Sequence, residues 1–162
     1  MKAAIVYYSM SGNTEYAAKK IAEKTGAELI KIEPEKKYPD KGALKFLWGG
    51  KSVIMGEKPK LKPYSFDADK YDTVIFGTPV WASSVSPPVK SFIAENRDKL
   101  KGKRFAAFFC FLGGGADKAE EKLKRLLGTE KLASSLVLID PLNKPTEENG
   151  NKLASFCEAL VK

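Results

Sequence analysis

The fold is decided by Ala3-Ala4-Ile5-Val6-Tyr7-Tyr8 and the six residues that follow it, Ser9-Met10-Ser11-Gly12-Asn13-Thr14. The first run is apolar and predicts a buried strand, whereas the second is a short hydroxyl-rich loop that leads into a helix. Its three hydroxyls, several backbone N–H groups and the positive end of the helix dipole can converge on one dianion. The loop contains no Lys or Arg. This favours a terminal phosphomonoester, held by neutral donors, over a triphosphate.

Short apolar runs alternate with longer amphipathic segments along the rest of the chain, which indicates repeated strand–helix–strand units. Strands are predicted at residues 2–8, 28–32, 71–77, 104–112 and 135–139, and helices at 13–25, 87–100, 116–127 and 147–161. The pattern predicts an α/β fold, a three-layer sandwich around a five-stranded, doubly wound parallel sheet. Ligands of such sheets bind at the carboxyl ends of the strands.

Length and composition predict a soluble globular protein with one domain, residues 1–162, because the chain is 43% hydrophobic and 30% charged. Residues 34–70 form an insertion between the second and third strands, and a helix at 44–54 within it is weakened by Gly49-Gly50. The insertion holds nine Lys against five acidic residues, an excess that is half of the net charge of +8. We find no nucleic-acid motif. A solvated surface or docking to an acidic partner are the two interpretations.

The chain has no histidine, so the commonest general base and the commonest metal ligand are both missing. We therefore predict no catalytic residue and no metal, and any redox chemistry requires a bound cofactor. Cys110 and Cys157 fall in a predicted strand and helix, so we expect both to be buried and not to form a disulfide. The start of the chain shows no signal-peptide pattern, and no apolar stretch approaches the ~20 residues of a membrane span. We expect a cytoplasmic protein without membrane contact.

Two further loops follow strands and should meet the hydroxyl-rich loop at one edge of the sheet. They are residues 78–84, Thr78-Pro79-Val80-Trp81-Ala82-Ser83-Ser84, and residues 112–116, Leu112-Gly113-Gly114-Gly115-Ala116. A phosphate site, an exposed Trp and a bare backbone loop predict a pocket for a flat aromatic ring with a phosphate tail. The alternatives are a capped turn for the first loop, a core position for Trp81 and an ordinary flexible connection for the glycines.

Taken in order, these motifs make the chain resemble the flavodoxin family over nearly its whole length. The first loop matches the family's phosphate pattern: hydroxyl residue, any, hydroxyl residue, Gly, any, Thr. The run Gly77-Thr78-Pro79-Val80-Trp81, followed by Ser86-Pro87-Pro88, looks like the second flavin loop of that family. The resemblance implies a flavodoxin-like sheet of strand order 2-1-3-4-5 and bound FMN.

The resemblance also assigns site residues. It implies that the FMN phosphate is held by Ser9, Met10, Ser11, Gly12, Asn13 and Thr14. It implies that Thr78 belongs to the second flavin loop, and that the isoalloxazine ring is bordered by Pro79, Val80, Trp81 and Ala82. Backbone groups of Leu112, Gly113 and Gly114 would face the pyrimidine edge of the ring. We further expect a backbone carbonyl near residues 81–84 to accept a hydrogen bond from N5–H of the reduced flavin.

In this interpretation the protein is a diffusible electron carrier that shuttles electrons between redox partner proteins, as a monomer or weak dimer. Two departures from the family leave an alternative open, an FMN-dependent NAD(P)H:quinone-type oxidoreductase. The chain is basic where flavodoxins are acidic, which points to partners with acidic docking surfaces and to a less negative second reduction potential. The third loop also lacks the aromatic residue common there, so Trp48 or Tyr38 of the insertion would have to cover that ring face, or leave it open.

Other phosphate-binding classes fit poorly. A phospho-receiver needs clustered acidic residues after the first strand and Asp at the end of the third, where this chain has Tyr8-Ser9 and Thr78. The dinucleotide fingerprint G-x-G-x-x-G does not follow the first strand, and the triphosphate motif G-x-x-x-x-G-K-[ST] is missing from the sequence.

Overall fold

The first strand divides the core into two halves. In the computed structural model, which describes residues 2–39, 51, 53 and 55–161, strand β1 (Ala3–Tyr7) is buried along its whole length. Because successive side chains of a strand point to opposite faces, Ile5 enters one hydrophobic cluster and Val6 the other. Such two-sided burial is typical of a central parallel strand covered by helices on both faces.

The element order confirms the predicted α/β fold. After β1 come α1 (Asn13–Thr25), β2 (Glu28–Lys31), the 3₁₀ helix η1 (Ala68–Lys70), β3 (Thr73–Trp81), β4 (Ser84–Val85), α3 (Pro87–Glu95), β5 (Arg104–Phe111), α4 (Ala116–Leu127), β6 (Ser135–Ile139) and α5 (Glu147–Val161). Five parallel strands lie in the order β2-β1-β3-β5-β6, which is the predicted order 2-1-3-4-5 of the five long strands. The short β4 is an addition, paired antiparallel with β3.

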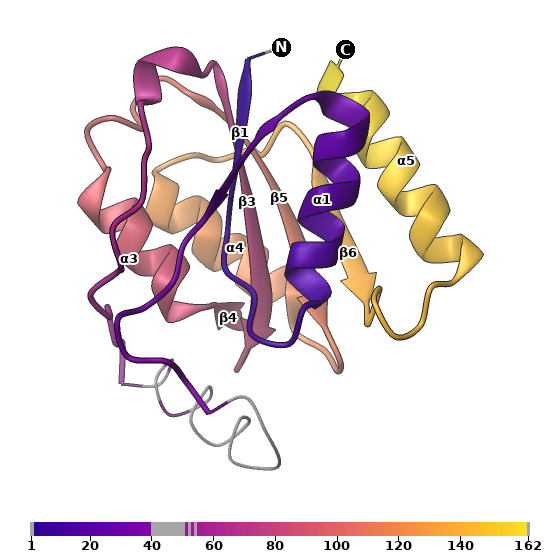
Figure 1. Ribbon diagram of the computed structural model, residues 1–162, viewed down its shortest axis with the longest axis horizontal. Helices are drawn as coiled ribbons and strands as arrows, with labels where there is room; N and C mark the ends of the chain where they lie inside the picture. Colours follow the sequence, from indigo (N-terminus) through magenta and orange to yellow (C-terminus); the bar gives the residue numbers. More distant parts are fainter. Residues whose placement is uncertain (1, 40–50, 52, 54, 162) are drawn as a thin grey trace.

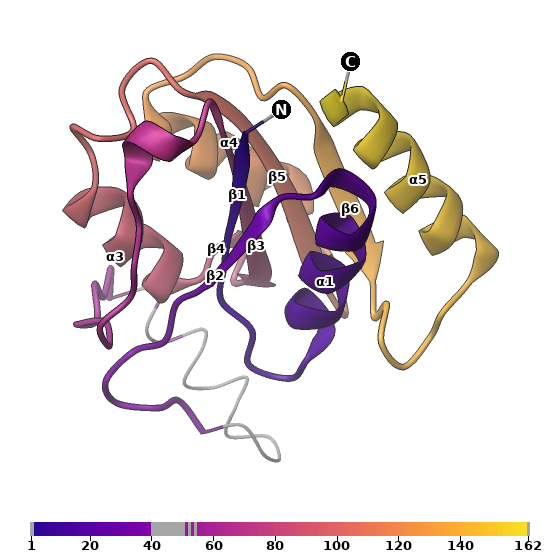
Figure 2. The ribbon, with the colours of Figure 1, turned by 45° about the horizontal axis from the view of Figure 1, so that its top comes forward.

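Helices cover both faces of this sheet (Figures 1 and 2). Helices α1 and α5 pack together on one face, where Ile21 and Phe156 join Ile5 in the core. Helices α3 and α4 cover the other, where Phe92 and Leu123 join Val6. The connections after β1, β3 and β5 all emerge at the carboxyl edge, the lower edge in Figure 1, so they surround one region of the surface.

Two element boundaries differ from the sequence prediction. Residues 78–84 are not a loop, because β3 continues to Trp81 and pairs with β4 through Val80↔Val85 and Trp81↔Ser84. Only residues 82–83 form the turn of this hairpin. Helix α3 ends at Glu95 rather than at residue 100, since the Asn96 side chain donates a hydrogen bond to the carbonyl of Phe92 and terminates the helix.

Within the insertion, Pro34 and Leu61 form a small antiparallel bridge. Beside it, the N–H of Glu35 donates to the carbonyl of Lys60 at 2.9 Å. Most of the helix predicted at 44–54, with Trp48, lies outside the described residues. No helix in the described part of the chain combines the length and apolarity that a membrane crossing requires.

Candidate functional site

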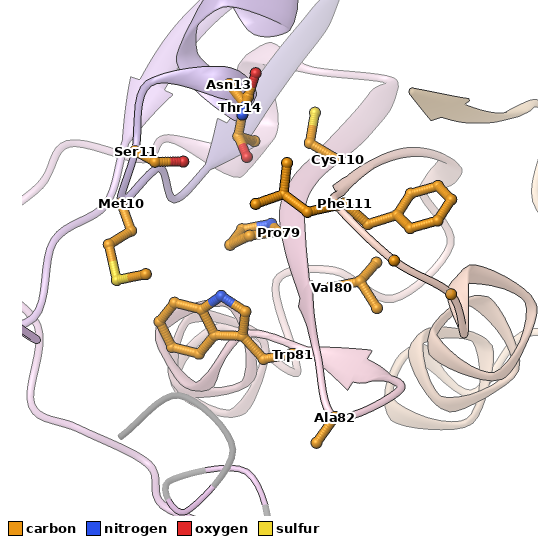
Figure 3. Close-up of a pocket in the computed structure, with 13 residues that line it drawn as sticks. Met10, Ser11, Asn13, Thr14, Pro79, Val80, Trp81, Ala82, Cys110 and Phe111 are labelled. Carbon is orange, nitrogen blue, oxygen red and sulfur yellow. The ribbon is translucent and has the colours of Figure 1, made fainter. Parts of the chain in front are cut away.

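A cavity of about 580 Å³ opens at the carboxyl edge of the sheet, and its size is in the range of about 300–1,000 Å³ found for small-molecule sites. It is lined by Met10, Ser11, Asn13, Thr14, Pro79, Val80, Trp81, Ala82, Cys110, Phe111, Leu112, Gly113 and Gly114. Asn13 and Thr14 lie at one end, Trp81 and Ala82 at the other, and Pro79 between them (Figure 3). The three predicted loops therefore meet around one cavity.

The end of the cavity beside α1 is an array of hydrogen-bond donors. Within the described chain, the backbone N–H groups of residues 9–15 donate to no other group. Gly12 caps α1 without a side-chain hydrogen bond to the first turn. The Ser9 hydroxyl is buried and likewise finds no partner among the described residues. A buried hydroxyl such as that of Ser9 is rarely left unpaired, so it requires an acceptor, and the helix dipole favours an anion there.

The first two residues of α1 are both buried but face different neighbours. The Asn13 side chain donates to the Asp140 carboxylate at 3.0 Å, so only its backbone N–H is available to an anion. The Thr14 hydroxyl lies beside the thiol of Cys110. Burial raises the pKa of this thiol to about 12, and the Thr14 contact offsets the rise only in part. Cys110 therefore stays protonated at neutral pH and forms an uncharged wall of the cavity.

Trp81 is held edge-on by two tyrosines at the opposite end of the cavity. Its ring lies 5.8 Å from Tyr8 and 5.3 Å from Tyr38, with interplanar angles of 88° and 87°. Such edge-to-face pairs stabilise a ring orientation by about 0.5–1.5 kcal/mol each. Trp81 is half-buried and lines the cavity, so it is not a core residue. Tyr38, from the insertion, thereby connects that segment to the site.

The hairpin turn next to Trp81 is strained. Ala82 and Ser83 both adopt left-handed backbone angles, with φ of 46° and 52°. This suits a two-residue turn of type I′, which usually contains Asn or Gly. Gly115, at φ 92°, packs so closely against Ser83 that any β-carbon there would collide with it. The hairpin turn at residues 82–83 and the loop at residues 112–116 are therefore packed tightly against each other. Backbone strain of the kind seen at Ala82 and Ser83 clusters at functional sites.

The third loop is open to solvent. Leu112 is 57% exposed, and a β-carbon added at Gly113 or Gly114 would meet no described atom within 4 Å. Packing within the described chain therefore does not require these two glycines, and both close approach of a ligand and an ordinary flexible connection agree with this open space.

Most of the residues singled out from the sequence line the cavity. Ser9, Gly12 and Thr78 do not. Thr78 is fully buried, and its hydroxyl accepts a hydrogen bond from the N–H of Ser86 at 3.0 Å, which fastens the hairpin to the start of α3. Direct contact of these residues with FMN remains a prediction.

Sequence reasoning missed Cys110 and Phe111 as lining residues. They end β5 immediately before the third loop, and the same rule that placed the loop at the carboxyl edge could have included them. The described residues that line the cavity carry no charged side chain. Nor does any group of His, Cys, Asp or Glu among the described residues have an arrangement suited to a metal ion.

Comparison with known proteins agrees with this geometry. The family model described as flavodoxin matches residues 2–149. A flavodoxin from Maridesulfovibrio salexigens is 31% identical over 136 residues, covering 77% of each chain. A solved protein from Bacteroides eggerthii is 25% identical, with a TM-score of 0.76 over 99% of this chain and 98% of its own. A flavoprotein from Lactobacillus acidophilus, solved in complex with FMN, is 21% identical, with a TM-score of 0.72 over 86% of this chain and 93% of its own. The chain belongs to the flavodoxin family, the FMN-binding proteins of electron transport.

Proposed function

We propose that the protein is an FMN electron carrier that works between redox partner proteins, in the cytoplasm and as a monomer or weak dimer. One observation carries the proposal: a single cavity joins an array of neutral donors to an apolar, open edge, and its described lining has no charged group. Acid–base catalysis needs a titrating side chain near the reacting atoms. Electron transfer needs only a held and partly exposed cofactor.

The residues present fit FMN. Its phosphate would accept hydrogen bonds from the buried Ser9 hydroxyl and from the unpaired backbone N–H groups of residues 9–15. Its ring would lie between Trp81 and the backbone of residues 112–114. When bound, FMN supplies the chemistry, the uptake and release of one or two electrons. The chain contributes position, exclusion of water from the buried end, and hydrogen bonds.

The strained turn supplies one of these hydrogen bonds in our proposal. A backbone carbonyl within residues 81–84 would accept a hydrogen bond from N5–H of the reduced flavin, because Ala82, in the left-handed turn, lines the cavity. Potentiometric titration tests this step. Two resolved one-electron transitions are expected, whereas a single two-electron transition contradicts the hydrogen bond.

We propose that partners dock through acidic surfaces at a basic groove beside the ring end. The groove, about 640 Å³, is lined by residues 35–39 and 57–60. Lys60 is paired with Glu35 at 2.8 Å, but Lys36, Lys37 and Lys58 are exposed and form no ion pair with any described residue. Tyr38, in the same groove, packs on Trp81. Positive charge therefore lies beside the edge through which electrons would leave.

Charged oxidants test the docking surface without a known partner. Ferricyanide, an anion, should oxidise the photoreduced holoprotein faster at low than at high ionic strength, and hexaammineruthenium(III), a cation, should show the reverse. A Lys36→Glu/Lys37→Glu variant should lower the ferricyanide rate several-fold. Lys24→Glu, in the last turn of α1 at the other edge of the sheet, is the control and should change the rate little. Equal effects of both variants would contradict a localised docking surface.

The exposed third loop favours one second candidate, an FMN-dependent NAD(P)H:quinone-type oxidoreductase. Leu112 is more than half exposed, and the loop provides no aromatic side chain to cover the ring face. A nicotinamide could approach there. Steady oxidation of NAD(P)H with a quinone by the protein alone would select this candidate, and no turnover is expected from a carrier.

A further inference from the structure

A loop from the far end of the chain holds the donor array in place. The Asp140 carboxylate accepts hydrogen bonds from the side-chain amides of Asn13, at 3.0 Å, and Asn143, at 2.8 Å. The Asn13 side-chain oxygen in turn accepts the N–H of Leu142 at 2.9 Å. Both polar ends of the Asn13 side chain are therefore bonded to the connection between β6 and α5. We call these four residues, Asn13, Asp140, Leu142 and Asn143, the clamp.

Asp140 is built into this position. Asp140 is 8% exposed, and its backbone adopts a left-handed φ of 42°, a conformation that residues other than glycine rarely adopt and that asparagine and aspartate adopt more often than most. Its N–H donates to the carbonyl of Phe111 at 3.2 Å, so the end of β5, which lines the cavity, fixes the position of the Asp140 backbone. Its carbonyl accepts the N–H of Lys144 at 2.8 Å. The strained backbone persists because neighbours on both sides determine it.

The clamp also reaches the donor array through packing. Gly12 has a left-handed φ of 93°, and a β-carbon there would lie 2.9 Å from Cδ2 of Leu142. Leu142 therefore packs against Gly12, within the loop whose N–H groups have no partner among the described residues. Two contacts of different kind, one polar and one apolar, join the same two segments across more than 120 residues of chain.

We propose that Asp140 is a positioning residue for the cofactor phosphate, acting through Asn13. By fixing the first residue of α1, it keeps the backbone N–H groups and the hydroxyls directed at one point. The inference rests on the proposed function, because it assumes that the FMN phosphate is the anion held there. The carboxylate also has a cost, since a negative charge near a bound dianion is repulsive. Its value must therefore lie in its oxygen as an acceptor and in its backbone geometry.

Asp140→Asn and Asp140→Ala should therefore affect FMN binding differently. Asp140→Asn keeps an accepting oxygen, tolerates the left-handed backbone better than Asp, and removes the repulsive charge. Asp140→Ala removes the acceptor and leaves the Asn13 amide unpaired. Apo-protein titrated with FMN and with riboflavin, which lacks the phosphate, gives the readout. We expect Asp140→Ala to weaken FMN binding about 10-fold, a typical value for a lost hydrogen bond to a charged group, and riboflavin binding less than 2-fold.

Asp140→Asn should bind FMN at least as tightly as the unaltered protein. A merely structural loop would lower both affinities together, so an equal loss for FMN and riboflavin in Asp140→Ala would overturn the inference. A 10-fold loss of FMN in Asp140→Asn with riboflavin unchanged would also overturn it, because the charge would then be the attractive element.

A double-mutant cycle keeps the test decisive if Asp140→Ala unfolds. Asn13→Ala, Asp140→Gly and the pair should show non-additive effects on the ratio of FMN affinity to riboflavin affinity, since the two side chains act as one unit. Glycine removes the acceptor and adopts the left-handed backbone without strain. Independent effects would contradict the clamp. If the unaltered protein binds FMN and riboflavin equally, the phosphate anchor itself fails. A phosphate preference that Asp140→Ala leaves intact overturns only the clamp.

Discussion

The two ends of the cavity are built on opposite principles. The phosphate end consists of neutral donors, among them the buried Ser9 hydroxyl, beside a polar network that reaches from Asn13 to Asp140. The ring end consists of a strained turn at residues 82–83, an exposed glycine loop and a groove whose Lys36, Lys37 and Lys58 form no ion pair with a described residue. The phosphate end is held by contacts within the chain, whereas the ring end is open to solvent and, in our proposal, to redox partners.

The two ends should therefore contribute to different properties of the site. Neutral donors at a helix N-terminus can bind a dianion without placing a full positive charge near the ring, so they contribute affinity and leave the reduction potentials to other groups. The ring end has little structure that could dominate affinity, and in our proposal its open edge and the nearby Lys36 and Lys37 govern electron exit and docking. Variants at the two ends should therefore fail in different ways.

The largest effect is expected from Gly12→Ala at the phosphate end. The backbone there has φ of 93°, which costs an alanine about 1–2 kcal/mol, and Leu142 must also move. We expect the apo-protein to lose stability by about that amount, and FMN affinity to fall more than 10-fold because the donors no longer converge. Fluorescence titration and thermal unfolding measure the two.

Gly26→Ala, at the other end of the same helix, is the matched control. Its φ is 70°, but a β-carbon there meets no described atom within 4 Å. It should lose similar stability without loss of FMN affinity. If both variants bound FMN as the unaltered protein does, the conformation of the loop would not matter for binding.

Ser9→Ala should change stability and affinity in opposite directions. Its buried hydroxyl has no partner among the described residues, and such a group destabilises a fold by about 1–3 kcal/mol. Removing it should leave the apo-protein equally or more stable, yet weaken FMN binding about 10-fold with riboflavin unaffected. A less stable apo-protein with intact FMN affinity would place this hydroxyl in the core rather than in the anchor.

Hydrophobic periodicity predicted the strands and helices, and the loops after strands predicted where the cavity lies, because both are local signals. The strand order was predicted from the resemblance to the flavodoxin family, and the structure confirms it. Sequence reasoning missed the hairpin, since Val80 and Trp81 followed a proline and looked like a loop, yet β4 supplies their strand partner. It did not predict the contact of the Asn13 side chain with Asp140, which lies 127 residues away, because no local pattern in one sequence reports such a contact. The assignment of Asn13 to the phosphate site stays a prediction, through its backbone N–H.

At the ring end, Gly115→Ala should weaken FMN and riboflavin binding equally, by a few-fold. The new β-carbon collides with Ser83, so the hairpin turn must shift away from the ring. Gly128→Ala, at φ 67° with no described neighbour within 4 Å, controls for the backbone cost alone and should leave both affinities unchanged. A loss confined to FMN would mean that the turn acts on the phosphate end, against the division proposed.

The smallest effect concerns acid stability. Hydrogen bonds from Asn143 and Asn13 lower the pKa of Asp140 below its ordinary value. A lowered folded pKa means that the carboxylate stabilises the fold above the unfolded value of about 3.9, and that this contribution is lost as pH falls through the folded value. The stability of Asp140→Asn relative to the unaltered protein should therefore rise as pH drops below about 4, measured by urea unfolding. A difference independent of pH would show that Asp140 is not held as a carboxylate.

Titration of the unaltered apo-protein with FMN and riboflavin, under identical conditions, shows whether neutral donors of residues 9–15 anchor a phosphate. We expect FMN to bind at least 10-fold more tightly, since several hydrogen bonds to a charged group are lost with riboflavin. Equal affinities would contradict the anchor, and with it the division between the two ends of the site.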